Sequence, residues 1–320
     1  MKESEILIRS YGKVNLSIDV TGILPNGMHS VDMVMQQISL HDDVKIKLVT
    51  DKKKQVGKRI KISTNRYYLP VDERNLAYKA CQLILDKYEK TINKNYKDVE
   101  IHVDIFKRLP VAAGLAGGSS NGAAVLHGLN VLFNLHLSLE TLCKLGEELG
   151  SDVPFCIMGQ ARANYVLPRK VRKDRLATSC ARASGTGTNL EPVKGIRKCV
   201  VLGKPGIGVS TKDVYRGIDS CEILSRPDND KMCEALETEA FEQVESQMVN
   251  VLENYTVNKF DEVKNLKSLM EEKFGDKGKV MMTGSGPTVF VLLDDIMEAK
   301  EGCKELRSKK YEAYWCKTTK

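Results

Sequence analysis

The stretch from Leu109 to Asn130, LPVAAGLAGGSSNGAAVLHGLN, constrains the fold more than any other part of the chain. It consists largely of Gly, Ala and Ser, and it lies between a strand-like run at residues 100–106 and a helix-like run. Residues this small let two backbones pack closely, or let a ligand touch the backbone itself. A glycine-rich turn at a helix N-terminus exposes unpaired N–H groups to an anion. Phosphate is therefore the expected ligand, and close packing of a helix on a strand is the alternative.

The stretch matches neither of the two most common phosphate loops. GLAGGSS, residues 114–120, lacks the Lys of G-x-x-x-x-G-K-[ST], and Ala116 interrupts any G-x-G-x-x-G match. The hydroxyl groups of Ser119 and Ser120 are candidates to bind phosphate or a magnesium ion instead. Lys107, just before the stretch, is placed either to reach a phosphate or to lie in solvent.

The composition indicates a globular protein. The chain has 320 residues, of which 42% are hydrophobic, and this is enough for two domains with a core in each. The charged start MKESEILIRS has no apolar run of the signal-peptide type, and no stretch approaches the ~18 apolar residues of a membrane span. We therefore expect a cytoplasmic protein without a membrane partner. The nine Cys and five His are scattered, which favours reduced thiols and no metal site built by the protein alone.

The net charge of +7 is concentrated in one segment. Residues 160–180, QARANYVLPRKVRKDRLATSC, carry six Arg or Lys and one Asp, so five of the seven charges lie there. Binding to a nucleic-acid backbone needs basic residues spread over a surface. We therefore expect no nucleic-acid partner.

Alternating hydrophobic residues predict strands in the first half of the chain. In VNLSIDV, residues 14–20, the alternation is that of a half-buried strand, and it places Lys13 and Asn15 on the same face. VKIKLV from Val44 and EIHVDIF from Glu100 follow the same period. The first half is thus a mixture of sheet and helix.

Helical periodicity begins after the glycine-rich stretch. Val125, Leu129, Leu132 and Phe133 predict an amphipathic helix, and a second helix should run from Ser138 to Gly150. The second half predicts strands at KCVVL, KVMM, PTVFVLL and YEAYWC, with helices at about 231–254, at 259–274 and from 296. Helices on one face of an antiparallel sheet make an α+β arrangement.

PVAAGLAGGSS resembles the ATP loop of the GHMP kinase superfamily, P-x-x-x-G-L-G/A-G-S/G-S. Five further motifs are similar to one branch of that superfamily, and with the loop they run the length of the chain. They are YGKVNLSIDVTGILPNGMHSVDMVMQQISL, LPVDERNLAYKA, GSDVPFCIMG, KPGIGVSTKDVYRGID and MTGSGPTVF. This branch uses ATP to phosphorylate the 2-hydroxyl of a cytidine-diphosphate-linked methylerythritol, a step of the non-mevalonate route to isoprenoid precursors.

The resemblance implies a two-domain α+β GHMP kinase fold. The N-terminal domain should be like ribosomal protein S5 domain 2, and the C-terminal domain should be ferredoxin-like. We place an N-terminal ATP-binding domain at residues 1–159, an atypical basic insertion at 160–183 and the C-terminal domain at 184–320. ATP and Mg²⁺ are the implied cofactors, the small-molecule substrate is the implied partner, and a monomer or homodimer is expected.

The resemblance also implies the site residues. Asp152 matches the base that takes the hydroxyl proton, and Lys13 matches its cationic partner, which keeps the base ionised and lowers the pKa of the substrate hydroxyl. Taken singly, Asp152 is equally suited to cap a helix, and Lys13 to be a solvated lysine. The implied ATP-binding residues are Lys107, Pro110, Val111, Ala112, Ala113, Gly114, Leu115, Ala116, Gly117, Gly118, Ser119 and Ser120. The implied substrate-binding residues are Asn15, Met28, His29, Thr211, Tyr215, Gly284, Ser285 and Gly286.

Two departures from the family pattern stand out. Met28 replaces an aromatic residue, so one of two rings expected to sandwich cytosine is missing. The basic insertion is the other departure, since ARAN at 161–164 is echoed by ARAS at 181–184, and removal of residues 161–180 restores the family pattern. The sequence leaves open whether this segment is an exposed loop, a regulatory or partner-binding arm, or a lesion that impairs folding.

Two rival functions stay open at this point. One is a GHMP kinase with another alcohol substrate, such as homoserine or mevalonate. The other is a GHMP-fold protein that binds nucleotides or a partner without catalysis.

Overall fold

The computed structural model describes residues 4–50, 60–88, 90–92 and 99–320. The chain divides into two compact units, each assembled from separate stretches. Unit 1 comprises Met1–Gly12, His41–Leu109 and Ala116–Ala177, and unit 2 comprises Lys13–Leu40, Pro110–Leu115 and Thr178–Lys320. These units differ from the continuous domains drawn from the sequence, whose bounds stay a prediction.

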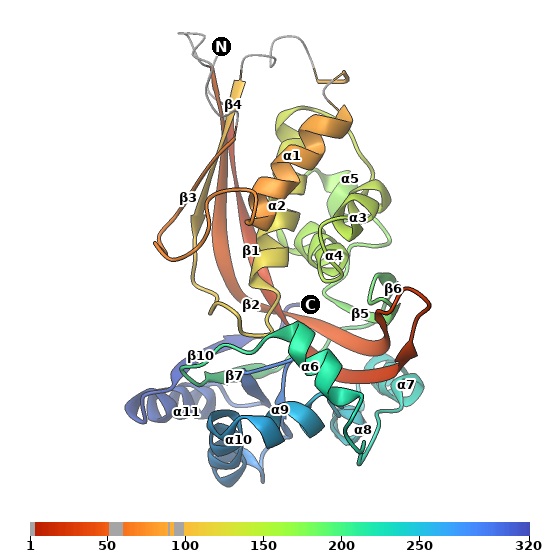
Figure 1. Ribbon diagram of the computed structural model, residues 1–320, viewed down its shortest axis with the longest axis vertical. Coiled ribbons are helices and arrows are strands. Elements are labelled where there is room, and N and C mark those ends of the chain that lie inside the picture. Colours follow the sequence, from red (N-terminus) through yellow and green to blue (C-terminus); the bar gives the residue numbers. More distant parts are fainter. Residues whose placement is uncertain (1–3, 51–59, 89, 93–98) are drawn as a thin grey trace. The chain divides into compact units, whose positions relative to one another are not determined.

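Unit 1 contains strands on one side and helices on the other (Figure 1). The long strands β1 (Ser4–Ile23) and β2 (His29–Thr50) each begin in one unit and end in the other. In unit 1, β2 pairs antiparallel with β4 (Val99–Phe106), which pairs parallel with β3 (Ile60–Thr64). The strands predicted from Val44 and from Glu100 are thereby confirmed.

Among the described residues of unit 1 there are five helices, and their apolar side chains share one core with the strands. They are α1 (Leu76–Tyr88), α2 (Gly117–Leu132), α3 (Leu139–Glu147), α4 (Val153–Ala163) and α5 (Arg169–Arg172). Ser138 caps α3 as predicted, accepting a hydrogen bond from the N–H of Thr141. The helix α2 is not amphipathic, because every residue from Ser120 to Asn130 is buried. Its polar residues therefore lie in the interior, where each needs a partner.

Unit 2 contains a four-stranded antiparallel sheet in the order β10-β7-β9-β8. Its members are β7 (Cys199–Lys204), β8 (Val280–Met282), β9 (Val289–Leu293) and β10 (Glu312–Lys317). The helices α10 (Asp261–Phe274) and α11 (Ile296–Ser308) pack on this sheet, so the chain follows the β-α-β-β-α-β order of a ferredoxin-like domain. All four strands were predicted from the sequence, and they confirm the α+β arrangement.

Elsewhere in unit 2, β2 pairs with β5 (Cys180–Gly185), and β5 pairs with β6 (Asn189–Pro192). The prediction of one long helix at 231–254 is wrong. That segment forms α7 (Asn229–Thr238), α8 (Phe241–Gln247) and the start of α9 (Glu253–Lys259), after the short helix α6 (Thr211–Ile218). The break is tertiary in origin, because Ile18 of β1 exchanges backbone hydrogen bonds with Val249 and Val251 at 2.8 and 3.0 Å.

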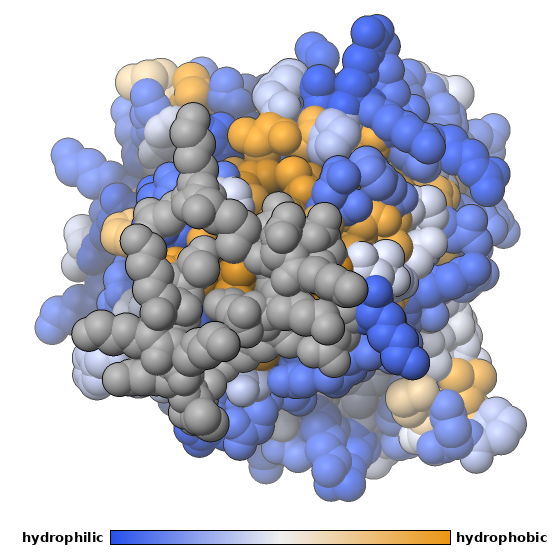
Figure 2. All heavy atoms as spheres, turned by 90° about the horizontal axis from the view of Figure 1, so that it is seen from above, coloured by the Kyte–Doolittle hydropathy of each residue, from blue (hydrophilic) through white to orange (hydrophobic). Residues whose placement is uncertain are grey.

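No helix within the described ranges combines the length and the apolar run needed to cross a membrane. The end of the molecule that carries α1 and β4 shows mostly hydrophilic side chains, with a hydrophobic area near its centre (Figure 2). None of the nine cysteines forms a disulfide, and burial raises the pKa of the Cys81 and Cys180 thiols. These thiols are therefore packing residues rather than nucleophiles.

Candidate active site

Lys13 and Asn15 are brought together in unit 2 on one face of β1. The Nζ of Lys13 donates to Oδ1 of Asn15 at 2.6 Å, and the backbone N–H of Asn15 donates to Oγ1 of Thr283 at 3.0 Å. Lys13 is only 4% exposed, and Asn15 and Thr283 are fully buried. The predicted strand is confirmed, but it is buried on both faces here, so the expected half-burial and the solvated-lysine alternative are wrong. A buried polar face at a strand is typical of a binding or catalytic site.

The turn at residues 283–288 packs against the start of the glycine-rich stretch within unit 2. Gly114 has φ +70°, and a Cβ there would lie 2.3 Å from the carbonyl oxygen of Thr283. Gly284, with φ +59°, likewise lies close to the backbone of Gly114. Close backbone packing thus explains these two glycines. Such packing was the expected alternative to a phosphate loop. The two glycines meet across two turns, not between a helix and a strand.

The N-terminus of α2 in unit 1 has a different character. The backbone N–H groups of Gly117, Gly118 and Ser119 have no hydrogen-bond acceptor among the described residues, and Ala116 provides no side-chain cap. A Cβ on Gly118 would meet only a Leu76 methyl group at 3.8 Å, an ordinary contact. Packing therefore does not explain this glycine, and phosphate binding at this helix N-terminus stays a prediction.

The hydroxyl of Ser120 is used inside unit 1. It donates to the carbonyl of Tyr11 at 2.6 Å and accepts from Nε2 of Gln160 at 3.0 Å. Deeper in α2, the buried His127 lies 2.9 Å from the carbonyl of Ile157, and burial lowers its pKa to about 4. The imidazole is therefore neutral at pH 7 and donates to that carbonyl. These bonds tie α2 to β1 and to α4, and of the two serines Ser119 is the more exposed.

Lys107 is buried in unit 1, beside the start of α2. Its Nζ donates to the carboxylate of Asp42 at 2.5 Å and to Oδ1 of Asn121 at 3.1 Å, with Lys107 5% and Asp42 0% exposed. Asp42 also accepts the backbone N–H groups of Arg108 and Leu109 at 2.7 and 2.8 Å. The solvated alternative for Lys107 is therefore wrong. The ammonium group lies near Gly117, where a Cβ would be 3.2 Å from Nζ.

Asp152 is the residue immediately before α4 in unit 1, at the N-cap position. Its backbone carbonyl accepts the N–H of Cys156 at 3.2 Å, and Pro154 lies in the first turn, where the missing N–H costs nothing. Its side chain makes no capping hydrogen bond to α4. The alternative that the Asp152 side chain caps the helix is therefore wrong. The assignment of Asp152 as the base stays a prediction.

The predicted cytidine-binding residues form two contacts in unit 2. The rings of His29 and Tyr215 lie 5.2 Å apart at 46°, and Nε2 of His29 is 2.8 Å from Oδ1 of Asp219. The hydroxyls of Thr211 and Ser285 are 2.9 Å apart. Asp219 was not predicted as a site residue, although it ends the motif KPGIGVSTKDVYRGID. Its contact with His29 spans 190 positions and could not be read from spacing.

The basic segment is part of unit 1 up to Ala177 and is not an exposed loop. Leu167 is 2% exposed and lies in the core. The buried Asn164 side chain bonds both the N–H and the carbonyl of Arg9, at 2.9 and 3.0 Å. Most of the basic side chains point to solvent. The extra charge therefore lies on the outer face of a segment that the core requires.

Deletion of residues 161–180 is expected to destabilise the protein strongly. The deletion removes Leu167 from the core, and emptying one such leucine site alone costs about 2–5 kcal/mol. It also removes the end of α4 and the first residue of β5. Thermal unfolding followed by circular dichroism measures this. The control is a full-length variant with Arg169→Gln and Lys170→Gln, two exposed residues, which should unfold like the parent; a deleted chain that unfolds at the parent temperature would contradict the prediction.

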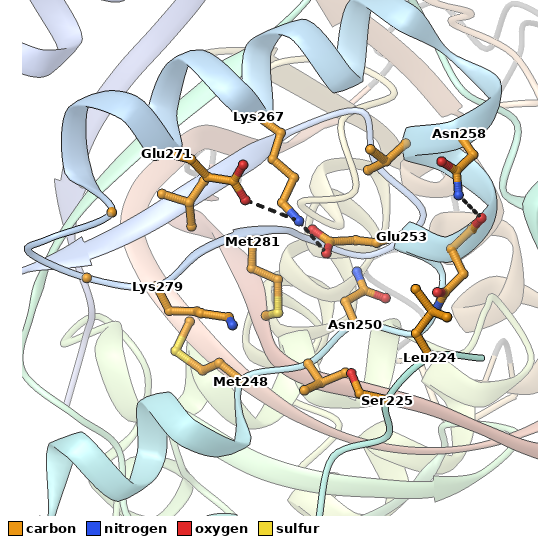
Figure 3. A pocket seen from close by; sticks show the side chains of 16 residues that line it. Leu224, Ser225, Met248, Asn250, Glu253, Asn258, Lys267, Glu271, Lys279 and Met281 are labelled. Carbon is orange, nitrogen blue, oxygen red and sulfur yellow. Dashed lines mark hydrogen bonds and ion pairs between the residues drawn. The ribbon is translucent and has the colours of Figure 1, made fainter. Parts of the chain in front are cut away.

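A pocket of about 430 Å³ also lies in unit 2, and none of the predicted site residues lines it (Figure 3). It is bordered by α9, by α10 and by the chain leading into β8. Across the described residues, no group of three His, Cys, Asp or Glu side chains is arranged to hold a metal ion.

Comparison with known proteins places this geometry in a family. Residues 75–160 match the model of the GHMP kinases N terminal domain, and residues 232–313 match that of the GHMP kinases C terminal domain. The chain is 41% identical over 312 residues to 4-diphosphocytidyl-2-C-methyl-D-erythritol kinase of Clostridioides difficile (strain 630), covering 97% of this chain and 94% of the relative. It is 40% identical over 289 residues to the Bacillus subtilis (strain 168) protein of the same name, covering 90% and 88%.

Solved structures agree with this assignment. A crystal structure of 4-(cytidine 5'-diphospho)-2C-methyl-D-erythritol kinase superposes with a TM-score of 0.75 at 25% identity, covering 98% of this chain and all of that one. Homoserine kinase from Cytophaga hutchinsonii has a TM-score of 0.66 at 14% identity, covering 100% and 95%, a likeness of fold alone. The predicted two-domain GHMP kinase fold is confirmed. The chain belongs to the 4-diphosphocytidyl-2-C-methyl-D-erythritol kinase family of the GHMP kinases.

Proposed function

We propose that the protein transfers the γ-phosphoryl group of ATP to the 2-hydroxyl of 4-diphosphocytidyl-2-C-methyl-D-erythritol, giving the 2-phosphate and ADP. The reaction is a step of the methylerythritol phosphate route to isoprenoid precursors. The observation that carries the proposal is the 41% identity over 97% of the chain to a kinase of this name. The buried Lys13, Asn15 and Thr283 cluster in unit 2 supports it, since a solvent-excluded polar cluster suits phosphoryl transfer.

Asp152 is proposed as the general base for the 2-hydroxyl. Phosphoryl transfer is mostly positioning and charge neutralisation, and a carboxylate accepts the hydroxyl proton as the new O–P bond forms. Lys13 is proposed to supply the positive charge that favours the ionised forms of base and hydroxyl. Asn15, which holds the Lys13 ammonium at 2.6 Å, is proposed to contact the methylerythritol part.

ATP is proposed to place its phosphates at the N-terminus of α2. The three N–H groups without an acceptor and the open space at Gly118 suit phosphate oxygens at this point. The residues from Pro110 to Ser120 form this loop, with the Ser119 hydroxyl as a further donor. Lys107 is proposed to favour phosphate there through its charge. Mg²⁺ accompanying ATP would supply charge neutralisation on the phosphates, and the Ser119 hydroxyl is proposed as a protein ligand for it.

The cytosine ring is proposed to bind beside His29 and Tyr215. Tyr215 provides a face for stacking, and His29, held by Asp219 at 2.8 Å, provides a directed hydrogen bond to the base. Thr211, with Gly284, Ser285 and Gly286 of the turn, is proposed to complete the substrate site. The Thr211 to Ser285 hydroxyl contact ties the two groups together.

Met28→Tyr is expected to lower the KM for the cytidine substrate. Met28 is 50% exposed next to His29, so a ring fits there without displacing core residues. Stacking of a base on an aromatic ring contributes ~1–3 kcal/mol, which corresponds to a KM lower by about tenfold or more. Steady-state kinetics with varied substrate measure the effect, and the KM for ATP should stay unchanged as the internal control. An unchanged KM for the cytidine substrate would rule out a missing second ring.

ADP release in the presence of ATP, Mg²⁺ and each candidate alcohol tests the proposed function. Turnover with 4-diphosphocytidyl-2-C-methyl-D-erythritol is expected, and homoserine and mevalonate should give none. Turnover with only homoserine or only mevalonate would show that this alcohol, and not the cytidine compound, is the substrate. Calorimetric binding of ATP and of the cytidine substrate without turnover would favour a non-catalytic binding protein.

A further inference from the structure

Three side chains at residues 250–256 hold the 283–288 turn and the residue that precedes it. The amide Nδ2 of Asn250 donates to the carbonyls of Met282 and Gly284 at 2.8 and 2.9 Å. Glu253 accepts the N–H of Met282 at 2.6 Å, and the hydroxyl of Thr256 donates to the carbonyl of Ser285 at 3.3 Å. All four bonds lie within unit 2: two reach the backbone of Met282, the residue before the turn, and two reach the carbonyls of Gly284 and Ser285 within it. The turn is thus held by side chains that none of the site assignments includes.

Asn250 is itself fixed on both sides. It is 2% exposed, and its Oδ1 accepts the N–H of Leu252 at 3.1 Å. Its chain neighbours Val249 and Val251 are bonded to the backbone of Ile18 in β1 at 2.8 and 3.0 Å. Both donors and the acceptor of the amide are therefore used, and the residue carrying it is anchored to a strand. A buried side chain whose donors and acceptor are all bonded is held rigidly, so it fixes the position of the groups that it bonds.

The 283–288 turn links Asn250 to the proposed catalytic residues through hydrogen bonds. Thr283, between the two carbonyls that Asn250 holds, accepts the N–H of Asn15 at 3.0 Å, and Asn15 holds the Lys13 ammonium at 2.6 Å. Two residues further along, the hydroxyl of Ser285 lies 2.9 Å from the hydroxyl of Thr211. Asn250 is therefore three contacts from the Lys13 ammonium, through Thr283 and Asn15.

We propose that Asn250, with Thr256, is a positioning residue for phosphoryl transfer, which holds the 283–288 turn so that Thr283 keeps Asn15 and Lys13 in place. This inference rests on the proposed function. In this proposal Asn250 acts through Thr283 and Asn15 and does not itself contact the reacting atoms. Its effect falls on kcat, because a misplacement of about 1 Å at the reacting groups costs up to about 10²-fold in rate.

The pocket beside this segment supplies the matched control. Asn250, Asn254 and Asn258 all line it, and Figure 3 shows Asn250 near its centre beside Glu253. The side chain of Asn254 donates to the carbonyl of Val251 at 2.8 Å, and that of Asn258 donates to the carbonyl of Asn254 at 2.8 Å. These two amides are local to α9 and its first turn, and neither bonds the 283–288 turn. Asn254→Ala thus removes the same chemical group from the same pocket without touching the turn.

The test compares Asn250→Ala with Asn254→Ala in the full chain. We measure kcat and KM for ATP and for the cytidine substrate, their dissociation constants by calorimetry, and thermal unfolding. Asn250→Ala is expected to lower kcat about 10- to 100-fold with much smaller changes in both dissociation constants, and Asn254→Ala is expected to leave kcat near the parent value. A purely structural role would lower the unfolding temperature without this separation of kcat from binding.

Parent-like kcat in a folded Asn250→Ala variant would overturn the inference, as would an equal loss in Asn254→Ala. If Asn250→Ala does not fold, Thr256→Val decides, since it removes one hydroxyl bond to Ser285 with little change of shape. A several-fold lower kcat at parent-like affinity supports positioning, and an unchanged kcat overturns it. The parent chain is measured in the same assay. If the parent itself shows no turnover, the proposed function is refuted, together with the inference that rests on it.

Discussion

Asp152→Asn is expected to lower kcat about 10²- to 10⁴-fold, the usual cost of removing a positioned general base. Asparagine has nearly the same size but cannot take the hydroxyl proton. The fold should be retained, because the Asp152 side chain makes no capping hydrogen bond to α4 and its backbone bond to Cys156 is unaffected. The measurement is kcat at saturating ATP and cytidine substrate, with thermal unfolding of both proteins recorded alongside.

Asp86→Asn is the matched control for this variant. Asp86 is exposed on α1, and its carboxylate accepts a hydrogen bond from Gln82 of the same helix at 2.6 Å. This substitution should leave kcat unchanged. Near-normal turnover by a folded Asp152→Asn protein would show that another group takes the proton, whereas a loss of the same size in Asp86→Asn would point to a general effect of the charge change.

Lys107→Met is expected to lower the free energy of unfolding by about 3–5 kcal/mol, because it leaves the buried Asp42 carboxylate without its cation. Asp42 is fully buried, and its other partners are the Asn121 amide and two backbone N–H groups. These neutral donors do not balance a charge removed from water. Urea denaturation followed by circular dichroism measures the change.

Arg108→Met provides the contrast, because the adjacent Arg108 pairs with Asp43 at 2.7 Å on the surface. A surface pair contributes no more than about 1 kcal/mol, so this variant should be close to the parent. Combining Asp42→Asn with Lys107→Met should recover part of the loss, since it removes the unpaired charge. A Lys107→Met protein of parent-like stability but with a raised KM for ATP would show that Lys107 acts on the nucleotide and not on the fold.

The elements with strong local signals were predicted correctly. The strand at residues 100–106, the Ser138 cap and the four strands of the ferredoxin-like sheet follow from alternation or from capping chemistry within a few residues. The family was predicted from six motifs in a fixed order, and its motif residues need no knowledge of long-range contacts. Local patterns suffice where the physical cause is itself local.

The errors share one cause. The strand carrying Lys13 was expected to have one solvated face, the helix α2 was expected to be amphipathic, and residues 231–254 were expected to form one helix. In each case a partner far along the chain changes the outcome: Thr283 contacts the Lys13 face through Asn15, Tyr11 and Gln160 bond α2 through Ser120, and Ile18 pairs with residues 249 and 251. Burial and pairing of this kind override local propensity.

By itself, the sequence determined the α+β class, the order of most elements, the family and the candidate residues Lys13 and Asp152, because motif identity and short-range periodicity are properties of neighbouring residues. Only the tertiary structure decided that Lys107 is paired with Asp42 and that the Ser120 hydroxyl is used internally. It also decided that Leu167 makes the basic segment part of the core and that Asn250 holds the 283–288 turn. These contacts join residues 32 to 109 positions apart or depend on burial in the core, and sequence spacing does not encode which of many possible partners comes within hydrogen-bond distance.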